Sequence, residues 1–252
     1  MLLAVDVGNT RIKVAVFEDS TLLERFVFLG GELQKNILNI LKKYPNISDL
    51  VVASVGNVEK SGFLSFENSI KTHFITHETN FPFQNRYSTP LTLGIDRMVL
   101  ASGAVLQFPN QNRLVIDAGT CVTYDFIDAD NNYTGGAISP GIRLRYESLH
   151  NYTAKLPLLS LVEYNEMDNG PENKNFIGNS TQQSIHSGVI NGIVNEIDGC
   201  INQYREQYSN FIIILTGGDA EFLAKRLKNT IFANSNFLLE SLNQTFQYKN
   251  QK

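Results

Sequence analysis

The chain has 252 residues, of which 42% are hydrophobic, enough for a sizeable core in one large domain or two ordinary ones. Its net charge is −4 at pH 7, which excludes the strongly basic surface that attracts nucleic acid or an anionic membrane. Neither Cys121 nor Cys200 belongs to a Cys-x-x-Cys pair, so no disulfide framework or zinc site is expected. The lack of a long apolar run and of a leader-like start predicts a soluble cytoplasmic protein.

The first half of the chain predicts three short antiparallel strands, followed by alternating helices and strands. Apolar, β-forming residues dominate the strands, and tight turns join the first three. Helical spacing begins after Gly31 and stops before Pro45, whereas a later aperiodic segment with two prolines predicts a loop over the site. The expected elements are strands 2–7, 11–17 and 22–28, helix 31–44, strand 49–54, helix 59–70, strand 73–76, loop 77–93 and helix 95–107.

After Pro109 and Asn110 the pattern begins again, because Leu114 to Thr120 parallels Leu3 to Thr10 with one residue fewer in the turn. This internal repeat predicts a duplicated α/β fold with domains 1–108 and 109–252 and an active cleft between them. No role is assigned to the tail after Ser241. The expected elements are a strand from 114, strands 122–127 and 133–138, helix 140–151, polar loop 163–175, helix 180–207, strand 211–215 and a helix from 220.

The first turn has the composition of a phosphate-binding hairpin. A buried strand ends in a carboxylate, a polar turn follows, and the next strand brings back a cation, in the stretch Asp6-Val7-Gly8-Asn9-Thr10-Arg11-Ile12-Lys13. Gly8 lets the backbone approach a ligand, and Lys13 can neutralise phosphate charge. Asp6 should act through hydrated Mg²⁺, because a carboxylate repels phosphate. The alternative is a plain β-hairpin whose turn needs Gly and Asn.

A second turn of the same kind, Asp117-Ala118-Gly119-Thr120, favours the phosphate interpretation over the plain hairpin. A duplicated fold would bring both turns to face each other across one cleft, as actin-like and sugar-kinase-like folds do. Asp117 could then bind a cation, and Thr120 could bond a phosphate oxygen. The alternative for Asp117 is that it only caps its own turn.

The third motif, Gly94-Ile95-Asp96-Arg97, lies at the predicted start of a helix. Asp96 could be the general base for a hydroxyl that attacks ATP, and Arg97 could hold an anionic substrate with its planar guanidinium group. Spacing alone, however, favours the interpretation that Asp96 is an acidic residue that only complements the helix dipole.

Two further glycine-rich segments offer weaker signals. Thr216-Gly217-Gly218-Asp219 follows a predicted buried strand and is either an adenosine site or an ordinary strand–helix turn, since it lacks a dinucleotide or Walker A spacing. The segment Gly135–Gly141 is interpreted as packing and cleft floor. The four histidines have no metal-ligand spacing, and they and Cys121 are expected to be structural.

Together these motifs resemble those of the bacterial type III pantothenate kinases, in order and over nearly the whole chain. The matching segments are the first phosphate motif Asp6–Lys13, the Gly-x-Asp-Arg motif Gly94–Arg97, the second phosphate motif Asp117–Thr120, the shared segment Gly135–Gly141 and the adenosine turn Thr216–Gly218. Asp219 departs from the pattern. The resemblance implies the duplicated actin-like (ribonuclease H-like) fold of the acetate and sugar kinase, Hsp70 and actin superfamily. The implied reaction is the ATP-dependent phosphorylation of pantothenate, the first step of coenzyme A biosynthesis.

The resemblance also implies roles for individual residues. Asp96 is the implied general base, and Asp117 is the implied site of a monovalent cation, K⁺ or NH₄⁺, with Mg²⁺ accompanying the nucleotide. A homodimer is implied whose substrate pockets combine residues of both subunits. The implied ATP contacts are the stretch Asp6 to Lys13 and Thr120, and the implied pantothenate contacts are Tyr87, Gly94, Ile95, Asp96, Arg97 and, from the neighbouring region, Thr181.

Two alternatives remain beside this interpretation. One is a kinase of the same superfamily that acts on another small hydroxy acid. The other is a non-catalytic nucleotide-binding regulator of transcription. The intact Asp6, Lys13 and Asp96 and the lack of a basic surface argue against the regulator.

Overall fold

The computed structural model describes residues 1–8, 10–54, 61–64, 66, 70–166 and 176–250. Its first sheet has the strand order β3-β2-β1-β4-β5, in which β1, β2 and β3 are antiparallel neighbours and β4 and β5 run parallel to β1. The expected order of strands and helices in this half is confirmed. The bounds are β1 Leu2–Val7, β2 Ile12–Glu18, β3 Thr21–Phe28, α1 Leu33–Lys43, β4 Asp49–Ser54, α2 Ser61–Leu64, β5 Lys71–Phe74 and α3 Ile95–Gln107.

The second sheet repeats this topology in the order β9-β8-β7-β10-β11, with β6 added beside β9. Strands β7, β8 and β9 are antiparallel neighbours, whereas β10 and β11 run parallel to β7. The internal repeat in the sequence therefore corresponds to a structural duplication. The bounds are β6 Gln84–Asn85, β7 Arg113–Ala118, β8 Cys121–Ile127, β9 Asn132–Pro140, α4 Ile142–Asn151, α5 Leu161–Glu166, α6 Thr181–Gln207, β10 Ile212–Thr216, α7 Ala220–Ala224, β11 Phe232–Ala233 and α8 Phe237–Asn250.

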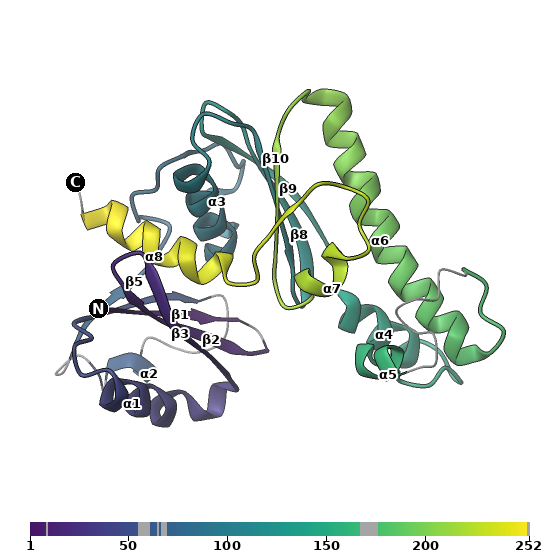
Figure 1. Ribbon diagram of the computed structural model, residues 1–252, viewed down its shortest axis with the longest axis horizontal. Helices are drawn as coiled ribbons and strands as arrows, with labels where there is room; N and C mark the ends of the chain where they lie inside the picture. The colour runs from purple at the N-terminus through teal and green to yellow at the C-terminus, as the bar shows by residue number, and fades with distance from the viewer. Residues whose placement is uncertain (9, 55–60, 65, 67–69, 167–175, 251–252) are drawn as a thin grey trace.

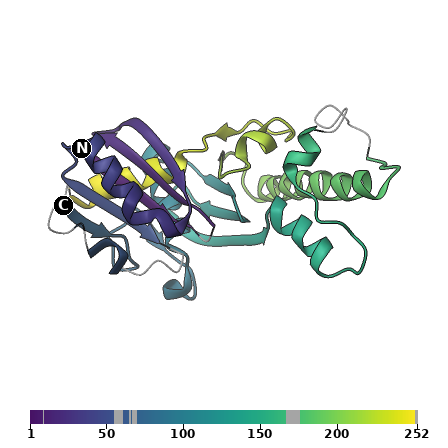
Figure 2. The same cartoon turned by 90° about the horizontal axis from the view of Figure 1, so that it is seen from below.

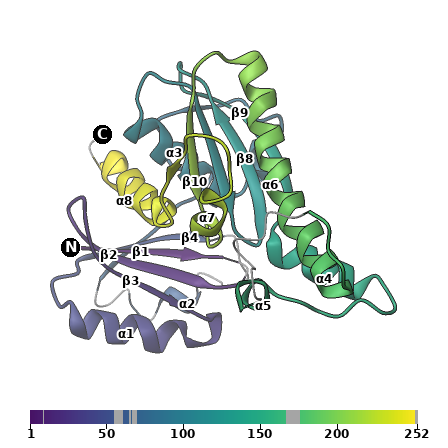
Figure 3. The same ribbon diagram turned by 45° about the vertical axis from the view of Figure 1, so that its right-hand side comes forward.

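The helices and sheets form stacked layers (Figures 1 and 3). Helices α1 and α2 cover the outer face of the first sheet, α3 and α8 lie between the two sheets, and α6 covers the outer face of the second sheet. Alternation along each strand divides the apolar side chains between two faces. Leu3 and Val5 of β1 face α1, whereas Leu2 and Ala4 face the central helices. The central layer therefore touches both halves of the duplication.

The tail after Ser241, to which the sequence assigns no role, belongs to the C-terminal helix α8. It packs against α3 and the first sheet, with Leu242 fully buried. Its buried face also holds polar side chains, and Thr245 donates a 2.7 Å hydrogen bond to Ser102 of α3. Because polar and apolar residues are mixed on the buried face, hydrophobic periodicity does not predict this helix. The division at residues 108 and 109 stays a prediction.

Smaller differences concern short elements. The segment 77–93 is not structureless, because β6 pairs with β9 and Pro90–Thr92 forms a 3₁₀ turn. Pro140 ends β9 instead of opening a helix, and α4 begins two residues later. Part of the predicted helix 59–70 and most of the polar loop 163–175 lie outside the described residues. None of the described helices is long and apolar enough to span a membrane.

Candidate active site

The two predicted phosphate turns meet in space. The first joins β1 to β2 and is closed by a hydrogen bond from Gly8 N–H to the Arg11 carbonyl, and the second joins β7 to β8 and is closed from Gly119 N–H to the Cys121 carbonyl. The hydroxyl oxygens of Thr10 and Thr120 lie 3.2 Å apart. The second turn is one residue shorter, as the sequence predicts, and Asn9 lies outside the described residues.

The strand registers aim the charged side chains of both turns at the central layer. In the first sheet Asp6 pairs directly with Lys13, and both lie on the face that carries Leu2 and Ala4. In the second sheet Asp117 pairs with Thr123 and lies on the face that carries Val115. The two turns therefore bring Asp6 and Asp117 toward one another from opposite sides of α3.

Helix α3 begins at this meeting point and supplies a third carboxylate. The Asp96 Oδ1 accepts a 2.8 Å hydrogen bond from the Arg97 N–H, so the side chain folds over the helix N-terminus. A Cβ at Gly94 would lie 2.4 Å from the Asp96 Oδ1. Glycine is thus required at position 94 for the carboxylate to take this position.

Asp6, Asp96 and Asp117 form what we call the carboxylate cluster. Burial raises the pKa of Asp6 to about 7 and that of Asp117 to about 6, while the charge of Lys13 opposes both shifts and that of Asp96 adds to them. Burial also raises the pKa of Asp96, although the Arg97 N–H and the Arg97 and Lys13 charges lower it. Lys13 is thus the cation whose charge acts on all three carboxylates. The negative charge of the cluster favours the binding of further cations.

Arg97 is buried and points at the second sheet. Its Nε and Nη2 atoms donate to the Asp125 Oδ1 at 2.9 and 2.6 Å, and the Tyr133 hydroxyl donates to the same oxygen at 2.6 Å. The ring of Tyr87 lies beside the guanidinium, with its centroid 5.9 Å from the Arg97 Cζ. Ile95 is buried in the central layer. The structure therefore brings Tyr87 and the whole Gly94–Arg97 motif to one place.

The turn after β10 lies against the second phosphate turn. Gly217 has φ +101°, and a Cβ there would lie 2.3 Å from the Ala118 carbonyl oxygen and 2.5 Å from the Asp117 Oδ1. Gly218, in contrast, is exposed and faces open space. Burial raises the pKa of Asp219 to about 6, and the nearby charge of Arg11 opposes the shift. Asp219 thus lies within the electrostatic reach of the first turn.

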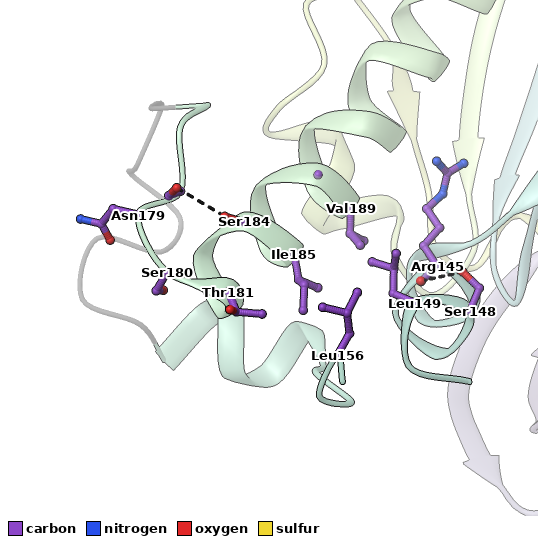
Figure 4. Close-up of a pocket in the computed structure, with 12 residues that line it drawn as sticks. Arg145, Ser148, Leu149, Leu156, Asn179, Ser180, Thr181, Ser184, Ile185 and Val189 are labelled. Atoms are coloured by element: carbon purple, nitrogen blue, oxygen red, sulfur yellow. Dashed lines mark hydrogen bonds between the residues drawn. The ribbon is translucent and has the colours of Figure 1, made fainter. Parts of the chain in front are cut away.

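Thr181 lies far from the carboxylate cluster of its own chain. It is exposed at the first turn of α6 and lines a pocket of about 920 Å³ between α4 and α6 (Figure 4). This end of α6 is remote from α3 in Figures 1 and 3, and Figure 2 shows α6 running away from the first sheet. A single chain therefore does not bring Thr181 to the other predicted substrate residues.

The carboxylates of this site could hold a cation whose other ligands are water and substrate oxygens. The buried Asp117 Oδ1 has no hydrogen-bond partner among the described residues. Buried oxygens normally have a partner, so this oxygen is a candidate cation ligand. No group of three His, Cys, Asp or Glu side chains in the described part of the chain could hold a metal ion. Mg²⁺ commonly takes one or two carboxylates plus water and substrate oxygens, which suits this arrangement.

Each histidine has a hydrogen-bond partner within the fold, and their structural role stays a prediction. The pairs are His73 with Asp49, His77 with the Leu93 carbonyl, His150 with the Leu156 carbonyl and His186 with Tyr146.

Sequence reasoning missed three residues near the site. Arg143 of α4 donates a 3.1 Å hydrogen bond to the Thr10 Oγ1 and adds a cation beside the two turns. A basic residue so soon after Pro140–Gly141 at a predicted helix start could have been singled out. Asp125 and Tyr133 lacked any such signal, because they lie on strands: Asp125 reaches the site through Arg97, and Tyr133 through Asp125 and the ring of Tyr87.

Comparison with known proteins gives a consistent family. The family model described as type III pantothenate kinase matches residues 2–203. A protein of Flavobacterium johnsoniae with the same description is 70% identical over 249 residues, which cover 99% of this chain and 98% of the relative.

Solved structures support the fold. A Campylobacter jejuni protein described as a Baf family transcriptional activator has a TM-score of 0.61 at 20% identity, covering 99% of this chain and 100% of that one. A ROK family protein of Streptococcus pneumoniae, in complex with sucrose, has a TM-score of 0.51 at 10% identity, covering 100% and 99%. At such identities the likeness concerns the fold alone. The predicted duplicated actin-like fold is confirmed.

Proposed function

The chain belongs to the type III pantothenate kinase family, and from this premise we propose that it transfers the γ-phosphoryl group of ATP to the primary hydroxyl of pantothenate, opening coenzyme A biosynthesis. The observation that carries the proposal is the meeting of the two turns at Thr10 and Thr120, beside the carboxylate cluster. Phosphoryl transfer asks for positioning and charge neutralisation more than for covalent chemistry. This site offers both.

The nucleotide phosphates would lie against the two turns. The hydroxyls of Thr10 and Thr120 meet at this point, and Lys13 lies on the same face of its sheet as Asp6. The Asp6 carboxylate and a phosphate group are both negatively charged and repel each other, so Asp6 would act through a hydrated Mg²⁺. The nucleotide contacts proposed are Asp6, Val7, Gly8, Asn9, Thr10, Arg11, Ile12, Lys13 and Thr120.

Asp96 is the proposed general base. Its carboxylate lies at the N-terminus of α3, and burial makes it more basic than an exposed aspartate. A base with a raised pKa accepts a proton more readily as the hydroxyl attacks. The charge of Lys13 lies close enough to oppose this rise in the pKa of Asp96.

The acceptor would lie against α3 and β6. Tyr87 and Arg97 lie side by side there, and the guanidinium suits the carboxylate of pantothenate. Gly94, Ile95 and Asp96 complete the contacts from this chain. The acid at one end of the acceptor and the hydroxyl at the other would thus face Arg97 and Asp96.

Two kinds of cation are proposed. K⁺ or NH₄⁺ would be held by Asp117, whose Oδ1 lacks a hydrogen-bond partner among the described residues, and Mg²⁺ would accompany ATP near Asp6. When bound, these ions would supply positive charge to the phosphate groups. The raised pKa values of Asp6 and Asp117 show how poorly the protein alone compensates their charges.

A homodimer is proposed as the working unit, with Thr181 entering the site of the neighbouring subunit. The distance of Thr181 from the cluster of its own chain supports this, as do exposed apolar side chains around α4 and the start of α6. These side chains are Tyr152, Leu158, Val162 and Phe176. Large exposed apolar groups commonly mark an interface. A cytoplasmic location stays a prediction.

Subunit complementation tests the dimer. Asp96→Asn and Thr181→Arg, each nearly inactive alone, are co-refolded in equal amounts. If each site uses Asp96 from one chain and Thr181 from the other, mixed dimers contain one intact site, and about a quarter of wild-type activity returns. No recovery, with mixed dimers demonstrated, would contradict the shared site.

A substrate panel tests the reaction. ADP release is followed with pantothenate, with pantothenol, which lacks the carboxylate, and with other small hydroxy acids, and the product is identified by mass. We expect phosphorylated pantothenate in equal amount to ADP and much weaker turnover of pantothenol. Equal turnover of unrelated hydroxy acids would instead favour a kinase with another substrate.

A further inference from the structure

We propose that Asp125 is a positioning residue, which fixes the Arg97 guanidinium for the acid end of the acceptor and keeps it from pairing with Asp96. The inference rests on the proposed function and deepens it. Asp125 lies on β8, eight residues beyond Asp117, and no motif in the sequence includes it.

In the described part of the chain, the hydrogen bonds of the Asp125 carboxylate all go to one of its two oxygens. Three donors converge on its Oδ1: Nε and Nη2 of Arg97 and the hydroxyl of Tyr133. The Oδ2 is buried and has no hydrogen-bond partner among the described residues. Two donors of one guanidinium on one oxygen restrict both the position and the plane of the group. Asp125 thus determines where Arg97 points.

The burial of this pair argues for a role beyond stability. Arg97 is 6% exposed and Asp125 is fully buried. Removing two charges from water costs about as much as their attraction returns, so buried pairs can often be replaced by apolar residues without loss of stability. The same helix contributes buried apolar side chains such as Met98 and Val99 to the core, and side chains of this kind would fill such a space.

The position of Asp96 gives the pair a function. Asp96 and Arg97 are neighbours on α3, and the Asp96 carboxylate already feels the Arg97 charge. In the described part of the chain the only ion pair of Arg97 is with Asp125. Without Asp125, the buried guanidinium would have the proposed base as the adjacent anion. Pairing with it would withdraw both groups from the reaction.

Tyr87 makes a second contact with Arg97. Its ring lies over Gly135, where a Cβ would come within 3.2 Å of the Tyr87 Cδ2, and beside the Arg97 guanidinium. Tyr133 links Asp125 to Tyr87: its hydroxyl donates a hydrogen bond to Asp125, and its ring centroid lies 6.3 Å from that of Tyr87. Strands β8 and β9 thereby hold both proposed acceptor contacts, one by charge and one by shape.

A double-mutant cycle between Asp125 and Arg97 tests the inference. For Asp125→Asn we expect kcat/KM for pantothenate to fall at least about tenfold, with the KM for ATP changed by less than about twofold, because a small misplacement of a binding group has effects of this size. In an Arg97→Gln background, Asp125→Asn should change kcat/KM by less than about twofold, because its partner is gone. Asp125→Glu, which restores the charge, should recover part of the loss.

The matched control is Asp198→Asn. Asp198 of α6 is likewise buried, with Oδ1 bonded to Asn229 and Oδ2 without a hydrogen-bond partner among the described residues, but it belongs to another part of the fold. It should leave the pantothenate kinetics unchanged. If Asp125→Asn does not fold, Tyr133→Phe removes one of the three donors and should raise the KM for pantothenate alone, about two- to fourfold.

The outcomes separate the two proposals. Turnover of pantothenate by the wild type, with additive effects of Asp125 and Arg97 or equal changes in both KM values, would overturn this inference alone. An unchanged pantothenate KM in Tyr133→Phe would also overturn it. A wild type without pantothenate turnover would overturn the proposed function and, with it, this inference.

Discussion

The hydroxyl oxygens of Thr10 and Thr120 lie 3.2 Å apart although 110 residues separate them in the chain. Each residue occupies the turn that follows the first strand of its half, and the two halves have the same strand order. The contact therefore joins equivalent turns of the two halves of the duplicated fold. Arg143, which donates to the Thr10 Oγ1, adds positive charge at this point.

Removing either hydroxyl should weaken nucleotide binding. We expect Thr10→Ala and Thr120→Ala each to raise the KM for ATP about two- to tenfold, the range of one or two hydrogen bonds. Because the hydroxyls touch, the double variant should lose less than the product of the single effects. Steady-state kinetics measures this, with Thr134→Ala, at an exposed threonine of β9, as the control. Strictly multiplicative effects would mean that the hydroxyls act independently.

Asp6 should make stability depend on pH with a definite sign. Its pKa rises from 3.8 to about 7 on folding, so between these values the folded state holds a proton that the unfolded state has lost. The free energy of unfolding therefore falls as pH rises through this window. Asp6→Asn removes the effect and should stabilise the protein at pH 8 by up to about 4 kcal/mol, and much less at pH 5.

Thermal unfolding at both pH values provides the measurement. Asp219→Asn should behave in the same direction but less strongly, because the pKa of Asp219 rises only to about 6. A Tm gain for Asp6→Asn that is the same at pH 5 and pH 8 would contradict the raised pKa.

The two glycines after β10 should respond differently to alanine. Gly217 has φ +101° and no room for a Cβ, whereas Gly218 faces open space. We expect Gly217→Ala to cost about 1–3 kcal/mol of stability through backbone strain. Gly218→Ala, its matched control, should change stability by no more than about 0.5 kcal/mol. Equal losses in chemical denaturation would show that position 217 is not strained.

The C-terminal helix should be an integral part of the fold. Leu242 of α8 is fully buried against the central layer. Leu242→Ala should therefore lower the free energy of unfolding by about 2–5 kcal/mol, as expected when a buried leucine leaves a cavity. Lys249→Ala, at an exposed position of the same helix, should have little effect. A stable protein truncated before residue 237 would contradict this role.

Local pattern was sufficient for much of the fold. The apolar strand ending in Asp6, the alternation that returns Lys13 and the restart at Leu114 predicted two hairpins, and the structure contains both. These features are readable because strand periodicity and turn chemistry involve only neighbouring residues. The alternation also places Asp6 and Asp117 on the inner faces of their sheets.

Contacts between distant elements were beyond such reasoning. The pairing of Arg97 with Asp125 joins a helix to a strand 28 residues later, and neither residue signals the other. Helix α8 was missed because Ser241, Asn243 and Thr245 are polar yet buried. The two-residue strands β6 and β11 are too short to have a period.

The central claim is that Asp96 takes the proton from the acceptor hydroxyl. Its most direct test is the kcat for pantothenate phosphorylation by Asp96→Asn against wild type, with Mg²⁺ and with K⁺ or Na⁺, after calorimetry has confirmed that both substrates still bind. We expect kcat to fall about 10²- to 10⁴-fold, as for loss of a general base, and wild-type turnover to depend on K⁺. Near-normal turnover by Asp96→Asn would contradict the account.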